Sequence, residues 1–167
     1  MARVVHTKAV NWPCWRSSVN EFLDMPSGST WELAGNYDPT KFFEALRLFA
    51  NNSPLILYIE GTSPEIRKEL LSFETDMAGP VRPGTTWPNS AKLHLRLTAE
   101  LIDKLIAISS ECAVPDYADH IVVYGDNIIL DAYDFTFIPF YISGTVEEGL
   151  VKEFARIVGS AYRAVTV

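Results

Sequence analysis

The sequence has few of the residues and motifs on which common enzyme chemistry depends. It contains only two cysteines and three histidines among 167 residues, which argues against a disulfide framework and against a zinc site of ordinary spacing. It also lacks a Walker loop and the motifs G-x-G-x-x-G, H-E-x-x-H, G-x-S-x-G and C-x-x-C. The sequence therefore predicts no cofactor and no bound metal, and it favours a protein that is not an enzyme.

Long hydrophobic runs are also missing. No apolar stretch approaches the roughly 18 residues that a membrane-spanning helix needs, and residues 1–6 lack the apolar segment of a secretion signal. Cys14 and Cys112 stand far apart, a pattern typical of two separate, buried thiols in a reducing compartment. We therefore expect a cytoplasmic protein with no membrane partner.

Basic residues are absent from a long part of the chain. The net charge is −7, and no lysine or arginine occurs between Lys104 and Lys152. Nucleic acid is a poor partner for such a chain, because a duplex needs a basic surface that displaces its counterions. The spacing of the acidic residues matches no EF-hand, so a solvated acidic face is the default interpretation. The base-free stretch carries the acidic residues Glu111, Asp116, Asp119, Asp126, Asp131, Asp134, Glu147 and Glu148.

The regular pattern of helices and strands begins near residue 38. Residues 1–37 follow no clear pattern and hold three of the four tryptophans, whereas residues 38–167 alternate between helical and strand periodicity. Apolar residues at helical spacing predict helices that begin at Asp38, Ser63, Thr98 and Thr145. Apolar runs or alternation predict strands at 55–59, 92–97, 120–124, 127–133 and 139–143.

Local signals fix several details of these elements. Asp38 and Pro39 are expected to cap and open the first helix, and Ser63 and Thr98 to cap the next two. Thr145-x-x-Glu148 has the form of a capping box, and Gly159 is expected to end that helix. Other details of the prediction are an i,i+4 pair of Glu100 with Lys104 and a third helix that ends at Pro115.

This order of elements predicts one α/β (α+β) domain over residues 1–167. The last three strands form an antiparallel meander, while the helical crossovers before them allow parallel neighbours. We therefore expect a mixed sheet of about five or six strands, packed by about four helices. The irregular segment 1–37 is expected to wrap this core, with Trp31 packed into it.

A predicted hairpin supplies the sharpest candidate for catalysis. If Gly125 and Asp126 form a two-residue turn, His120 lies directly opposite Asp131 on the neighbouring strand. A carboxylate beside an imidazole fixes its tautomer or raises its pKa, and such a pair can serve as a general base. The alternative is a structural polar pair on a sheet face, since no nucleophile is evident nearby.

Candidate binding residues lie near the same end of the hairpin. Asp116, Tyr117, Asp119 and Asp134 combine carboxylates with an aromatic ring, a mixture that suits recognition of a basic protein. A second candidate is the loop at residues 78–91, where Trp87 stands near Arg82. Exposed tryptophans and the last meander also permit a homodimer.

Two functions remain open on this evidence. The preferred one is a small acidic protein-binding or accessory module, of the immunity or regulatory kind common in bacteria, that binds a basic partner. The alternative is a small-molecule-binding protein or a cofactor-independent enzyme that uses His120 and Asp131. The first hypothesis predicts slower association when Asp116, Asp119 and Asp134 are changed to lysine.

Overall fold

The computed structural model describes residues 28–34, 36–50, 54–77, 79, 91–136 and 139–166. No helix within these ranges is long and apolar enough to cross a lipid bilayer. The helices are α1 (Pro39–Ala50), α2 (Pro64–Leu70), the 3-10 turn η2 (Leu71–Phe73), α3 (Ala99–Glu111), α4 (Val114–Tyr117) and α5 (Glu148–Val158). The strands are β1 (Ser29–Leu33), β2 (Ile56–Thr62), β3 (Ala91–Arg96), β4 (His120–Tyr124), β5 (Ile128–Ala132), β6 (Phe140–Ser143) and β7 (Tyr162–Thr166).

The seven strands form one open sheet in the order β3-β2-β4-β5-β6-β1-β7. Every neighbouring pair in the sheet is antiparallel. The predicted α+β class is confirmed, but the sheet has more strands than expected, and no two of the described strands pair in parallel. The prediction missed β1, which lies within the segment expected to be irregular, and β7, whose sequence Tyr-Arg-Ala-Val-Thr has no apolar alternation.

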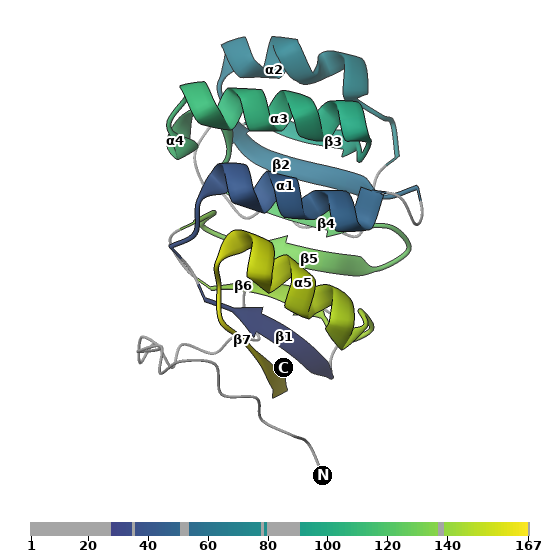
Figure 1. Ribbon diagram of the computed structural model, residues 1–167. Helices are drawn as coiled ribbons and strands as arrows, with labels where there is room; N and C mark the ends of the chain where they lie inside the picture. Colours follow the sequence, from purple (N-terminus) through teal and green to yellow (C-terminus); the bar gives the residue numbers. More distant parts are fainter. Residues whose placement is uncertain are drawn as a thin grey trace.

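The large helices cover one face of this sheet. Figure 1 shows α1 between α3 and α5, with all three lying over the strands and α2 beside α3. Inward side chains from these helices meet alternate strand residues in a continuous apolar core. Trp31 of β1 packs against this core, as predicted, and its Nε1 donates a hydrogen bond to the carbonyl of Val146 at 3.3 Å.

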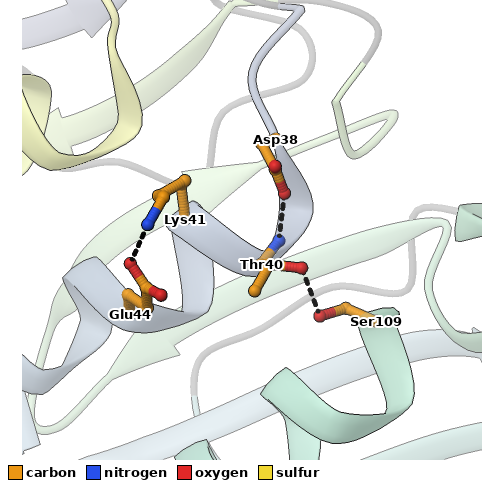
Figure 2. Close-up of polar contacts among 5 residues, drawn as sticks. All are labelled: Asp38, Thr40, Lys41, Glu44 and Ser109. Carbon is orange, nitrogen blue, oxygen red and sulfur yellow. Dashed lines mark hydrogen bonds and ion pairs between the residues drawn. The ribbon is translucent and has the colours of Figure 1, made fainter. Parts of the chain in front are cut away.

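Helix α1 shows why the local signals were informative. The main-chain N–H of Thr40 donates to the Asp38 carboxylate at 2.8 Å, which caps the helix as predicted (Figure 2). The hydroxyl of Thr40 lies 3.1 Å from that of Ser109, so a polar contact also joins α1 to α3. On the exposed side, Lys41 and Glu44 form an ion pair at 2.7 Å.

Three local predictions about helix ends and pairs were wrong. Pro115 does not end a helix, because α3 has already stopped at Glu111 and the proline lies in the first turn of α4. Lys104 forms an ion pair with Glu69 of α2 rather than with Glu100, since α2 and α3 lie side by side. The capping box is not formed, because Thr145 contacts Ser143 and α5 begins after Glu147 without a side-chain cap.

Candidate functional site

The face of the sheet opposite the helices, called here the far face, carries most of the polar groups of the strands. Alternate residues of β2 and β4 point away from the helix-side core and form a second, smaller apolar cluster with Tyr58 and Val122 in it. One row of registered strand partners crosses the entire sheet on this face. Its members are His94, Tyr58, Val122, Asp131, Tyr141, Glu32 and Arg163.

The two acidic residues of this row, Glu32 and Asp131, are buried. The Arg163 guanidinium of β7 donates to both carboxylate oxygens of Glu32 at 2.9 and 3.1 Å. Tyr141 lies between Glu32 and Asp131 in the register, and burial first, then the Glu32 charge, raises its pKa to about 12. On the other side of the sheet centre, the Tyr58 hydroxyl donates to the fully buried carboxylate of Glu60 at 3.0 Å. The row therefore contains two buried acidic residues, Asp131 and Glu32, and the buried Glu60 lies beside the row on β2.

The predicted register of the β4–β5 hairpin was wrong by two residues. The loop holds three residues, Gly125, Asp126 and Asn127, and an irregularity beside Tyr124 shifts the pairing so that Asp131 faces Val122. His120 and Asp131 are therefore not direct cross-strand partners. They still share the far face, because a shift of two residues preserves the side to which each side chain points.

His120 is tied into the end of the hairpin instead. Its ring stacks on that of Tyr133 with centroids 4.0 Å apart and an angle of 15° between the planes. Its Nδ1 accepts a hydrogen bond from the main-chain N–H of Asp134 at 3.0 Å, which leaves the proton of the neutral ring on Nε2. Because His120 is only 5% exposed, this geometry supports a role in holding the 133–134 turn rather than one as a general base open to substrate.

Asp119 precedes His120 in the sequence and is the last residue before β4. Its main-chain N–H donates to the carbonyl of Glu60 at 2.7 Å, and its carbonyl accepts from the N–H of Phe135 at 2.8 Å. Its carboxylate lies over Gly61, where an added Cβ would be 2.4 Å from Oδ2. Gly61 is thus required for the close approach as well as for its φ of +93° at the bulge of β2.

Asp134 approaches the same place from the following turn. Its φ of 44° puts it in the left-handed region that aspartate tolerates, and its side chain is exposed. The pKa of Asp119 is raised, first by burial and then by the charges of Glu60 and Asp134, while His120 opposes that shift. We call the carboxylates of Glu60, Asp119 and Asp134 the acidic end.

The same negative charges also affect the pKa of Tyr133, the residue before Asp134. Burial is the largest cause that raises the pKa of Tyr133, and the charges of Asp134, Glu60 and Asp131 add to it. Among the residues that the structure describes, neither Asp119 nor Asp134 forms an ion pair with a lysine or an arginine. The carboxylates of Asp119 and Asp134 therefore form an electrostatic environment that favours a cation.

The other predicted binding residues have different outcomes. Tyr117 is 1% exposed and packs against Phe43 and Phe135 in the helix-side core, so the prediction that its ring forms part of a recognition surface was wrong. Asp116 lies in α4, and its side chain is outside the described part of the structure, as are Trp87 and Arg82. No group of three or more His, Cys, Asp or Glu side chains within the described ranges could hold a metal ion.

Some features of the acidic end left little trace in the sequence. The stacking of His120 on Tyr133 depends on the irregular hairpin. The Asp119 side chain lies over Gly61 because β2 and β4, which are far apart in the sequence, are neighbours in the sheet. One available signal was the alternation of polar groups at Tyr58 and Glu60 within an apolar run, which marks the far face of β2.

The chain matches no known protein family, no characterised protein and no solved structure.

Proposed function

We propose that this protein is a protein-binding accessory module whose acidic end binds a basic segment of a partner. The observation that carries the proposal is that hydrogen bonds from main-chain N–H groups hold residues 119–120 against residues 134–135, while neither Asp119 nor Asp134 forms an ion pair with a lysine or an arginine among the described residues. A lysine or an arginine from another protein would relieve the repulsion between these charges. The negative charge also speeds association with a basic surface by long-range attraction.

The aromatic ring beside the carboxylates favours arginine over lysine in that segment. Tyr133 is half-buried, and one face of its ring lies on His120, which holds the ring in place. A guanidinium is planar, stacks on aromatic rings and binds a carboxylate through two parallel hydrogen bonds. Asp134, the next residue, supplies such a carboxylate at the surface.

The first experiment measures binding of a short labelled Arg/Lys-rich peptide at low ionic strength by fluorescence anisotropy. Each exposed charge pair contributes up to about 1 kcal/mol, so Asp119→Asn combined with Asp134→Asn should weaken binding about five- to tenfold. The matched control is Asp76→Asn combined with Asp126→Asn, two exposed aspartates outside the acidic end that remove the same total charge. Equal weakening by both double variants would show that only net charge matters, and would contradict the proposal.

The second experiment seeks the natural partner. The wild-type protein and both double variants are used as bait in the native host, and captured proteins are compared by mass spectrometry. We expect at least one basic protein that the wild type and the control retain and that the Asp119/Asp134 variant loses, with weaker capture at high salt. A set of captured proteins that is the same for all three baits would refute a role for the acidic end.

A further inference from the structure

The two edges of the sheet are finished in different ways. At one edge, Thr75 donates its main-chain N–H to the carbonyl of His94 in β3 at 2.8 Å, and Glu74 forms a bridge with Leu95. The chain itself therefore covers part of the β3 edge. At the other edge, β7 pairs with β1 on one side, and none of the described residues pairs with its outer side. The side chains of Arg163, Ala164 and Thr166 are exposed there.

The register shows which main-chain groups of β7 point outward. The N–H of Ala34 donates to the carbonyl of Ala161 at 3.0 Å, in line with the β1–β7 pairing that puts Leu33 opposite Tyr162. In an antiparallel pair, hydrogen-bonded positions alternate along the strand. Arg163 and Val165 therefore bond to β1, whereas the N–H and C=O groups of three residues point away from the sheet: Tyr162, Ala164 and Thr166.

Such an edge is a template for another strand, and natural sheets protect it with proline, charged side chains, a bulge or a covering segment. The sequence of β7 has no proline, its single charged side chain, that of Arg163, is paired with Glu32 of β1, and its pairing with β1 has no bulge. We propose that β7 pairs with β7 of a second copy of this chain, antiparallel about a two-fold axis at Ala164, so that the sheet continues across a homodimer. The inference is independent of the proposed function, because β7 and the acidic end are separate parts of the sheet.

The strand is complementary to itself in this one register. An axis at Ala164 pairs the whole strand and joins Tyr162 to Thr166 of the second copy, so that every outward N–H and C=O finds a partner. An axis at Arg163 would instead place two like charges directly opposite each other, which is unfavourable. With the axis at Ala164, Arg163 faces Val165 of the other copy and keeps its ion pair with Glu32. The smallest side chain of the strand then lies on the two-fold axis, where the two Ala164 residues form a hydrogen-bonded pair.

Hydrogen exchange and sedimentation together test this arrangement. Sedimentation equilibrium of the full chain should show a monomer–dimer equilibrium over micromolar to millimolar concentrations. As the dimer forms, the amides of Tyr162, Ala164 and Thr166 should gain protection from exchange, because no described residue of the same chain pairs with the outer side of β7. The amides of Arg163 and Val165 bond to β1 and should be protected at every concentration. A strict monomer, or a dimer without this alternating gain, would overturn the proposal.

Two variants alter the outer edge of β7 and should weaken the dimer while the monomer still folds. Ala164→Pro removes an N–H that points outward, so the monomer should fold while the dimer weakens at least about tenfold through the lost hydrogen bonds. Ala164→Lys places two like charges at the axis and should weaken the dimer about fivefold at low salt and less at high salt. The control Ala107→Lys adds the same charge on an exposed position of α3 and should leave dimerisation unchanged. A dimer unaffected by Ala164→Lys in a folded variant would also overturn the proposal.

Discussion

Replacing Tyr117 by phenylalanine tests whether a buried hydroxyl works against the stability of this fold. The ring of Tyr117 lies between Phe43 and Phe135, with centroids 6.1 and 6.3 Å away. Its hydroxyl is buried and has no hydrogen-bond partner among the residues that the structure describes. Burial is also the main cause that raises the pKa of Tyr117, because the charged form would lie in an apolar environment.

The expected gain follows from the balance of two effects. A buried polar group without a partner costs about 1–3 kcal/mol in lost hydration. Removal of the oxygen leaves a void smaller than a methylene group, which costs less than about 1 kcal/mol. The Tyr117→Phe variant should therefore be more stable than the wild type by about 1 kcal/mol. For a chain of this size, that gain raises Tm by roughly 2–4 °C.

Urea unfolding followed by far-ultraviolet circular dichroism measures the change as a higher midpoint with an unchanged slope. The matched control is Tyr37→Phe in the same core. The hydroxyl of Tyr37 accepts a hydrogen bond from the N–H of Thr136 at 3.2 Å, so its loss should destabilise the protein by about 1–2 kcal/mol. If both variants lose stability by similar amounts, the hydroxyl of Tyr117 has a partner in solution and the reasoning is refuted.

Two further predictions concern the half-buried Asp119 and the first turn of α1. The pKa of Asp119 is higher in the folded than in the unfolded protein. The ionised carboxylate of Asp119 therefore lowers the free energy of unfolding when the pH is above the pKa of the folded protein. This loss of stability disappears as the pH falls below the ordinary value of 3.8, because the carboxyl group is then protonated in both states. Asp119→Asn should therefore raise the free energy of unfolding at pH 7 but not near pH 3, and a constant difference at both pH values would contradict this cause. Asp38→Ala removes the cap of α1 and should cost about 1 kcal/mol in a urea titration, whereas Lys41→Ala, which removes an exposed ion pair of the same helix, should change little.

Elements with a strong local signal were predicted well. The cap at Asp38, the apolar stripe of α1, the alternation of β3 and the cap at Thr98 all appear where the sequence puts them. Each of these features depends on neighbours within a few residues, so the side chains that determine it are adjacent in the sequence. The continuous apolar run in β2 likewise matches a strand that is buried on both faces.

The acidic end was predicted in part. The sequence places Asp119 and Asp134 at the open end of one hairpin, and in the structure hydrogen bonds from main-chain N–H groups join residues 119–120 to residues 134–135 there. The partner of His120 was wrong, because the loop has three residues and the hairpin contains an irregularity that no turn residue signalled. Tyr117 was assigned to the surface because its position in the core depends on α1 and on the turn at Phe135, both distant in sequence.

By itself, the sequence determined the helix-capping residues, the inward faces of α1 and α3, and the acidic character of the chain, because these follow from local periodicity and composition. Only the tertiary structure decided the strand order, the antiparallel pairing of β2 with β4, and the place of β1 and β7 at the end of the sheet. Pairing between strands depends on main-chain hydrogen bonds, which are the same for every residue type except proline. The order of strands is therefore set by the packing of the whole core, to which every element contributes, rather than by any one segment.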